Sequence, residues 1–191
     1  MGRLASYLLF LLAGFGCTSA GPKTPEGQMP AEVFAPWNGV WKGRFEVLKR
    51  NEVLTRLDVV QKYWSESPNE QRAVFEERNV QTGERVTKKA LNSRKGDDLR
   101  CRVTGPDEEV EHRGRWTGKG LEWFRKTEDL EEHFFEVVET DANGRTYYII
   151  EGWGRYGGGD RLEFRARYKK VGTEEEARHL ATEGDPKVRQ L

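Results

Sequence analysis

The chain lacks several features that identify common classes of protein. Its 32 lysine and arginine residues balance 32 aspartate and glutamate residues, so it has no basic excess of the kind that nucleic-acid binding requires. No serine stands in a G-x-S-x-G pattern, and no two of the three histidines have the spacing of metal ligands. We therefore expect no catalytic residues, no metal site, no cofactor and no nucleic-acid partner, and we expect that the protein is not an enzyme.

The apolar run at the N-terminus is short. It extends from Leu4 to Cys17 and follows Arg3. As a helix it would reach roughly 21 Å at ~1.5 Å per residue, whereas the apolar core of a bilayer is about 30 Å thick. A basic start, a short apolar centre and small residues at its end are typical of a secretory signal peptide. We predict a signal peptide over residues 1–16 and a location outside the cytoplasm.

Cysteine is scarce, and one of the two cysteines ends the apolar run. Cys17 follows Gly16, as in bacterial lipoprotein signals, in which the cysteine is acylated and becomes the first residue. We favour Cys17 as a lipid anchor to the membrane of the cell envelope, because several acyl chains, at ~0.8 kcal/mol per buried methylene, hold a soluble domain durably. Cleavage after Ala20 without acylation and an uncleaved anchor are the alternatives. Residues 17–33 contain glycines and prolines that favour an extended tether.

If Cys17 carries lipid, Cys101 has no disulfide partner. Cys101 alternates with Leu99 and Val103 along a polar and apolar pattern. This alternation predicts a buried structural thiol.

Residues 34–171 alternate polar and apolar side chains with a period of two, and turn signals such as Asp141-Ala142-Asn143-Gly144 separate the runs. The pattern predicts an all-β fold: a single up-and-down antiparallel β-barrel of about ten strands, because closure removes the exposed edges of such a sheet. A sandwich is the alternative. Residues 172–191 begin with a capping-box pattern and predict a short C-terminal helix and a tail. The expected strands are 39–48, 53–64, 72–78, 85–94, 98–104, 109–116, 121–127, 131–139, 145–152 and 161–170.

The first expected strand begins with Gly39-Val40-Trp41, a G-x-W motif that resembles the start of the lipocalins and of the wider calycin group. In that group the tryptophan plugs the closed end of the barrel beneath an arginine from near the last strand. The resemblance therefore implies a lipocalin-like barrel over residues 34–171, in which Arg165 or Arg167 covers Trp41. The opening Gly39–Gly43 is also similar to that of nitrobindin-type haem barrels, but the last expected strand contains no histidine to bind haem.

Aromatic residues are abundant and spread over most expected strands. In a small barrel such residues either fill the interior or line a cavity for one apolar molecule. Our leading hypothesis is a non-enzymatic domain that binds a small hydrophobic ligand. A filled barrel that acts as an envelope scaffold or protein-interaction domain is one alternative, and a hydrolase or isomerase that uses the cavity is another. The candidate ligand-binding residues are Trp41, Phe45, Tyr63, Trp123, Phe135, Trp153 and Tyr168.

The segment Gly152–Gly157 has the letters of a dinucleotide fingerprint, G-x-G-x-x-G, but a strand rather than a helix is expected after it. We predict a wide hairpin or a rim loop there, in which Trp153 gates the mouth or packs against the wall. Arg155 and Arg161 are expected near the mouth, where they could meet an acidic head group. His133, beside two phenylalanines, is expected to point into the interior.

Overall fold

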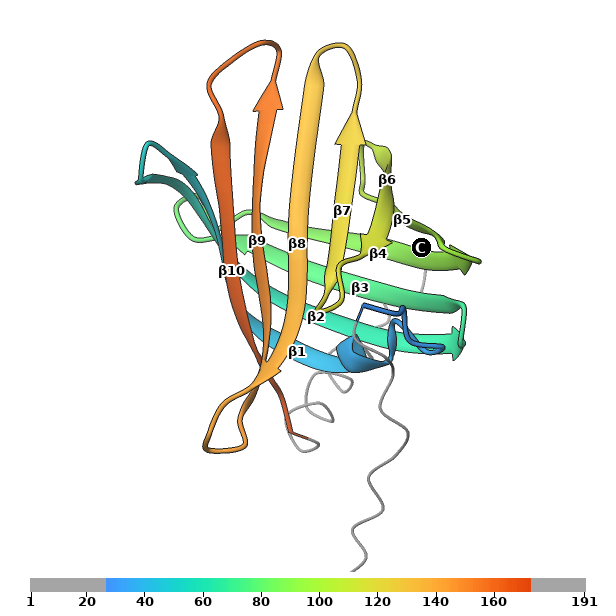
Figure 1. The fold of residues 1–191 in the computed structure, drawn as a ribbon. Coiled ribbons are helices and arrows are strands. Elements are labelled where there is room, and N and C mark those ends of the chain that lie inside the picture. Colours follow the sequence, from blue (N-terminus) through green and yellow to red (C-terminus); the bar gives the residue numbers. More distant parts are fainter. Residues whose placement is uncertain (1–26, 173–191) are drawn as a thin grey trace, which may run out of the picture.

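Ten antiparallel strands form a closed barrel, which confirms the predicted fold (Figure 1). The structure, a computed structural model, describes residues 27–172, so the predicted signal peptide, Cys17 and the predicted C-terminal helix lie outside the described residues. Each strand pairs with its neighbours in the chain, and the last strand returns to pair with the first. The elements are η1 (Ala35–Trp37), β1 (Gly39–Lys49), β2 (Glu52–Ser67), β3 (Glu70–Asn79), β4 (Arg85–Lys95), β5 (Asp98–Thr104), β6 (Glu109–Trp116), β7 (Leu121–Lys126), β8 (Leu130–Thr140), β9 (Thr146–Tyr156) and β10 (Leu162–Lys170).

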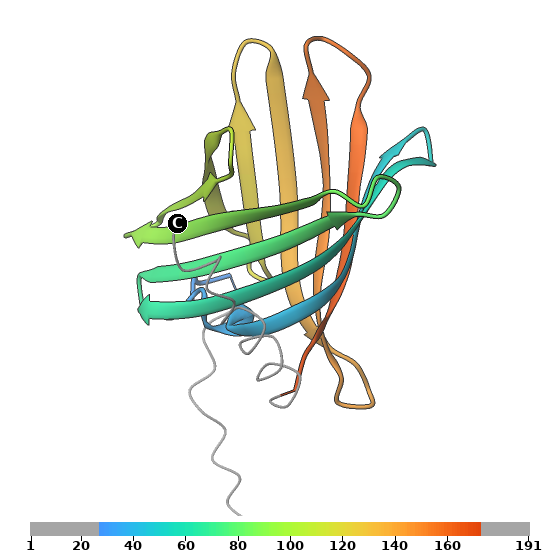
Figure 2. The same ribbon diagram turned by 180° about the vertical axis from the view of Figure 1, so that it is seen from behind.

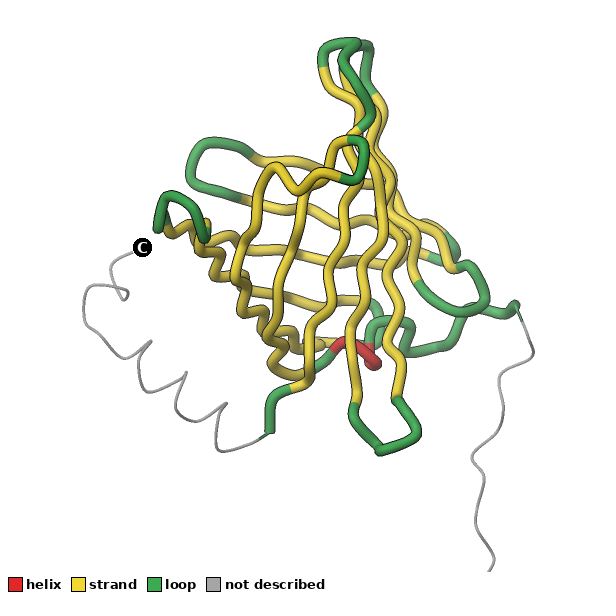
Figure 3. The backbone as a smooth tube through the Cα atoms, turned by 90° about the vertical axis from the view of Figure 1, so that its left-hand side faces the viewer, coloured by secondary structure: helices red, strands yellow, loops and turns green. Residues whose placement is uncertain are grey.

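The wall of the barrel is strongly twisted. In Figures 1 and 2, β2–β5 run across the view and β7–β10 run up it, and Figure 3 shows both halves curving into one wall. This coiling is the right-handed twist of β-strands accumulated around a closed sheet. The part of the chain that the structure describes contains no helix with the length and hydrophobicity of a membrane span.

Alternation along each strand separates an apolar interior from a charged exterior. On β10, Phe164, Ala166 and Tyr168 are buried, whereas the intervening Arg165 and Arg167 are exposed. The outer face carries ion pairs between neighbouring strands, for example Arg78 Nη2 to Asp58 Oδ2 at 2.6 Å. Exposed pairs of this kind contribute only ~0–1 kcal/mol each. The buried interior therefore supplies most of the stability.

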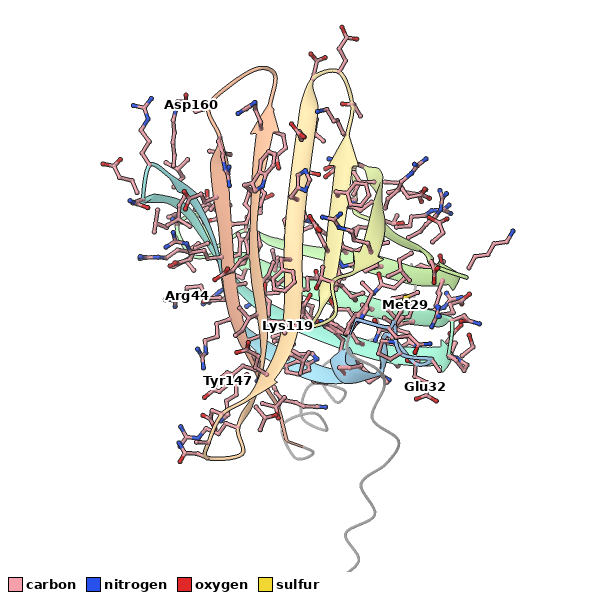
Figure 4. The ribbon with its side chains drawn as sticks, in the orientation of Figure 1. Met29, Glu32, Arg44, Lys119, Tyr147 and Asp160 are labelled. Atoms are coloured by element: carbon pink, nitrogen blue, oxygen red, sulfur yellow. The ribbon has the colours of Figure 1, made fainter. Side chains whose placement is uncertain are left out.

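The two ends of the barrel differ. Figure 4 shows Asp160 at one end and Tyr147 towards the other, where the segment with Met29 and Glu32 also lies. We call the end with Asp160 the mouth and the end with η1 the closed end. At the mouth, Lys49 Nζ lies 2.9 Å from Asp160 Oδ2, which joins the end of β1 to the β9–β10 loop.

The closed end is sealed by the chain segment that leads into β1. Val33, Phe34 and Trp37 are at most 2% exposed, and Trp41 is fully buried above them. The indole Nε1 of Trp41 donates a hydrogen bond of 2.6 Å to the carbonyl oxygen of Trp37. Val33 therefore packs against the barrel, although it is the last residue of the predicted tether, 17–33.

The cation over Trp41 is Lys170, whose Nζ lies 5.3 Å from the centroid of the indole ring. The resemblance to lipocalins implied an arginine from Arg165 or Arg167 at this place, and that expectation is wrong. Alternation along β10 turns both arginines outward, and Arg167 stacks over the ring of Tyr147 at 3.9 Å. Lys170 shares the inward face of β10 with Tyr168 and so reaches the tryptophan.

The glycine-rich segment is part of a strand rather than a loop. β9 continues through Gly152 and Gly154 to Tyr156, in register with β8 up to Leu130. The glycines relieve crowding: a Cβ at Gly152 would lie 2.3 Å from the carbonyl oxygen of His133, and one at Gly154 would lie 2.9 Å from the ring of Phe164. The prediction of a rim loop that starts at residue 152 was wrong, because close packing, rather than a turn, requires Gly152 and Gly154. The alternative prediction, a hairpin, is found, but its turn lies after Tyr156, between β9 and β10.

Candidate ligand cavity in the barrel

A cavity of about 260 Å³ occupies the interior between the mouth and the closed end. It reaches Gly105 and Glu108 of the β5–β6 loop on the mouth side and the tyrosines Tyr148 and Tyr168 on the other side. Most of its wall is apolar, as in sites that bind small molecules. Apolar side chains that face it include Phe45, Leu57, Val59, Phe75, Val103 and Phe134.

Three tyrosines form the floor of the cavity. The ring of Tyr148 lies 6.0 Å from that of Tyr63 and 5.4 Å from that of Tyr168, and it packs edge-on against Trp41 at 5.8 Å. The hydroxyl of Tyr63 donates to Oε1 of Gln61 at 3.3 Å. Burial raises the pKa values of all three phenols, so the floor stays neutral and presents aromatic faces and hydroxyl groups.

Glu136 projects from β8 into this cavity. Burial raises the pKa of its carboxyl group to about 7, although hydrogen bonds to the side chains of Trp123 and Tyr148 act in the opposite direction. Near neutral pH the carboxyl group therefore exists in both protonation states.

A second carboxylate, Glu132, is enclosed by its own partners. It is 7% exposed, and its oxygens lie 3.1 Å from Nε2 of His112, 2.9 Å from Nε of Arg125 and 2.5 Å from the hydroxyl of Tyr156. Burial opposes ionisation, but the hydrogen bonds from His112 and Tyr156 and the charge of Arg125 outweigh it and lower the pKa of Glu132 to about 2. The cluster ties β6, β7, β8 and β9 together within the wall.

The predicted ligand-binding residues divide into three groups. Phe45, Tyr63, Trp123 and Tyr168 line the cavity, and Trp41 lies beneath its floor. Phe135 and Trp153 border a separate depression on the outer face, so the expectation that they face the interior is wrong.

The outward residues of β8 and β9 form a stack of their own. The ring of Trp153 lies 4.5 Å from that of His133, and the guanidinium of Arg161 lies 4.6 Å from the indole centroid. His133 is therefore on the outside, contrary to expectation, and Nδ1 lies 3.5 Å from Oε1 of Glu122. His112 is the histidine that lines the cavity.

Several polar residues of the cavity were missed, among them Glu136 and Asn92. Glu136 shares the face of Phe134 and Val138, but the sequence does not show that this face is the inward one, because Phe135 and Val137 make the other face equally apolar. Asn92 occupies the same kind of inward position on β4, opposite Cys101.

Cys101 also lines the cavity. Burial and the nearby carboxyl group of Glu136 raise the pKa of its thiol, so the sulfur stays protonated and unreactive.

Gly114 controls how much of the interior Trp123 can occupy. A Cβ at this position would lie 2.3 Å from the indole ring of Trp123 and 3.0 Å from Cβ of Leu99. Because β6 has no side chain here, the large indole fits inside the wall beside the cavity.

Comparison with known proteins gives a likeness in fold. No protein-family model matches the chain, and no curated protein sequence matches it significantly. The barrel is similar to the S-type phycobiliprotein lyase CPES from Guillardia theta, with a TM-score of 0.57 and 6% identity over 78% of this chain and 96% of that one. A de novo designed fluorescence-activating β-barrel aligns with a TM-score of 0.39 and 10% identity over 73% of this chain and 98% of the design. The likeness to the lyase shows the fold alone, a closed antiparallel barrel.

Proposed function

We propose that this protein binds a small hydrophobic molecule inside its barrel and holds or carries it without changing it chemically. The observation that supports this proposal is the cavity, whose walls are mainly aromatic and aliphatic side chains. Transfer of an apolar molecule into such a space contributes roughly 25 cal/mol per Å² of surface removed from water. The cavity favours this function over the alternative of a completely filled barrel.

The place of action is part of the proposal and depends on the N-terminal sequence. We propose that Cys17 is acylated, that residues after it tether the barrel, and that the domain works outside the cytoplasm as a lipocalin-like bacterial lipoprotein. The leader Leu4–Cys17 and the Gly16-Cys17 junction support this view. Labelling of cells with radioactive palmitate tests it: we expect incorporation into the natural chain and none into Cys17→Ala.

Occupation of the cavity can be tested with Nile red, an apolar dye that fluoresces when it leaves water. We expect saturable binding to the natural protein. Val103→Trp should weaken binding by about tenfold or more, because the indole takes up part of the cavity and overpacking costs ~1–3 kcal/mol.

The matched control is Val60→Trp, since Val60 lies on β2 next to the inward-facing Val59 and therefore on the outer face. Its affinity for Nile red should equal that of the natural protein. Failure of the natural protein to bind saturably, or equal binding by both variants, would contradict the proposal. Mass spectrometry of an organic extract of the purified protein should in addition detect a bound small molecule. Its mass should not change when the purified protein is incubated before extraction, because the protein is proposed to hold the ligand without changing it chemically.

A further inference from the structure

The polar groups of the cavity point to one class of hydrophobic ligand. In the described residues, the basic side chains that line the cavity are Lys88 and His112. Lys88 Nζ lies 3.0 Å from Oε2 of Glu77, and Nε2 of His112 lies 3.1 Å from Oε2 of Glu132. Both basic groups therefore already have a carboxylate partner inside the protein.

Glu136 has the opposite situation. It lines the cavity, its partners are the neutral side chains of Trp123 and Tyr148, and no ion pair joins it to a basic side chain among residues 27–172. A carboxylate in an apolar environment is stabilised strongly by a nearby positive charge. The described part of the protein provides no positive charge for Glu136, so a cationic ligand would supply the missing partner.

Asn92 supplies a second, independent acceptor in the same cavity. Its side chain is 6% exposed, and its Oδ1 is buried without a hydrogen-bond partner in the described part of the chain. The orientation of the amide follows from its neighbours. Nε2 of Gln71 donates to the carbonyl oxygen of Phe34 at 2.8 Å, so Oε1 of Gln71 must accept from Nδ2 of Asn92 at 3.0 Å. The atom left for a ligand is the amide oxygen, which requires a donor.

The two acceptors line the same cavity. Asn92 on β4 is the direct cross-strand partner of Cys101 on β5, and the carboxyl group of Glu136 interacts electrostatically with that same thiol. The tyrosines of the floor add aromatic faces, which attract cations and not anions.

Among residues 27–172, no unpaired basic side chain lines the cavity to receive an acidic head group. Arg155 and Arg161 were expected to meet such a group at the mouth, but both lie on the outside. Arg155 is exposed on the outward face of β9. The guanidinium of Arg161 stacks on the indole ring of Trp153, which lies on the outer face of the barrel. The acidic Glu108 stands at the mouth side of the cavity instead.

We infer that the barrel selects hydrophobic molecules that carry a basic nitrogen, with the nitrogen directed at Glu136 and within reach of Asn92. This inference depends on the proposed function, because it names the class of ligand that the cavity takes. The protonated nitrogen forms an ion pair with the carboxylate, and the apolar remainder of the ligand lies against the phenylalanine and valine side chains of the wall.

Binding of a cation is coupled to release of a proton. The side chains that interact with Glu136 from the neighbouring elements include Trp123 of β7, Tyr148 of β9, Tyr63 of β2, Cys101 of β5 and Tyr168 of β10, and none of these carries a charge near neutral pH. The other ionisable side chains that line the cavity are Glu108, the paired Lys88 and Glu77, and His112, which is paired with Glu132. The proton that a cationic ligand displaces therefore comes from Glu136 and passes to the buffer. The affinity for a cation should rise with pH until Glu136 is fully ionised and then stay constant as long as the nitrogen of the ligand remains protonated.

Three probes that differ only in their head group test the inference: decylamine, decanol and decanoate. Binding is followed by the fluorescence of the tryptophans, of which Trp123 lines the cavity. At about pH 8 we expect the natural protein to bind decylamine about tenfold or more tighter than decanoate, with decanol between them. In Glu136→Gln this preference should fall below about twofold, whereas decanol binding is retained.

Glu139→Gln is the matched control, because Glu139 is an exposed residue of the same strand. It should keep the full preference for decylamine. If none of the three probes binds the natural protein, the proposed function fails. If they bind without a preference for decylamine, or if the preference survives in Glu136→Gln, the proposed function stands and the inference about the basic nitrogen is overturned.

A second measurement does not depend on the folding of any variant. In the natural protein, affinity for decylamine should increase about tenfold or more between about pH 5 and about pH 8, whereas affinity for decanol should stay the same. Calorimetry in buffers with different enthalpies of ionisation should show proton release with decylamine only. Equal pH profiles for the two probes would refute the inference.

Discussion

Replacement of Glu136 by glutamine should change how the stability of the barrel depends on pH. The carboxyl group of Glu136 has a pKa of about 7 in the folded protein because burial disfavours its charged form, against an ordinary value of 4.5. Below about pH 4.5 the group is protonated in both the folded and the unfolded chain, and burying it does not lower the free energy of unfolding. As pH rises from 4.5 to 7, the unfolded chain releases this proton first, so the natural protein loses stability. Above about pH 7 the penalty is constant.

The size of the penalty follows from the difference between the two pKa values. Each tenfold change in the dissociation constant corresponds to ~1.4 kcal/mol, so a pKa of about 7 against 4.5 means that the natural protein should lose about 2 to 3.5 kcal/mol across this pH range. The lower figure applies if water in the cavity reaches the carboxylate. Glu136→Gln has nearly the same shape and no charge to bury, and it should escape the loss.

Urea unfolding of both proteins at several pH values between about 4 and 8 measures the effect, because contributions from all other titrating groups cancel in the difference. The stability of the natural protein relative to Glu136→Gln should fall with pH. Glu139→Gln, an exposed substitution on the same strand, should follow the natural protein at every pH. A difference between the natural protein and Glu136→Gln that is constant over this range would refute the account of Glu136 as a buried group with a raised pKa.

Three further predictions concern the closed end, the wall and the cavity thiol. Trp41→Ala should cost about 3 to 5 kcal/mol of unfolding free energy, because Trp41 is fully buried, whereas Trp64→Ala, at a residue that is 37% exposed, should cost less than about 1 kcal/mol; equal losses in urea unfolding would show that Trp41 does not seal the barrel. Glu132→Ala should destabilise by about 3 to 5 kcal/mol at neutral pH, since it leaves the buried His112 and the partly buried Arg125 without their carboxylate partner. Because the folded pKa of Glu132 is lowered to about 2, its contribution is present above about pH 4.5 and is lost as pH falls towards 2, and a natural protein with constant stability over that acidic range would contradict this. In a Cys17→Ala chain, Cys101 should react with iodoacetamide only after unfolding, because burial raises the pKa of its thiol, and rapid labelling of the folded protein, followed by mass spectrometry, would argue against a buried thiol.

The sequence predicted the architecture well because β-strands and turns have sequence patterns that are local. A period of two within each segment and glycine-containing turns between segments depend only on neighbours in the chain. The expected strands 98–104 and 109–116 coincide with β5 and β6, and most other boundaries differ by no more than a few residues. The main exception is β9, where Gly152 and Gly154 serve packing inside the sheet rather than a turn.

The content of the site was predicted less completely. Phe134 and Phe135 are adjacent and equally apolar, so alternation requires one to point inward but does not say which. The register of β8 against its neighbours places Phe134 in the cavity and Phe135 outside. The same register carries His133 and Trp153 to the outer face, where their rings stack.

The sequence by itself determined that the chain forms ten amphipathic strands and closes them into one barrel, because the pattern of each strand and the need to cover its edges are local or general properties. The tertiary structure decided what the barrel contains. Whether a cavity exists depends on the summed volumes of side chains from many strands, and on single absences such as the missing side chain at Gly114 that makes room for Trp123. It also decided the charge inside the cavity, because pairing across strands gives Lys88 and His112 carboxylate partners and leaves Glu136 with neutral ones.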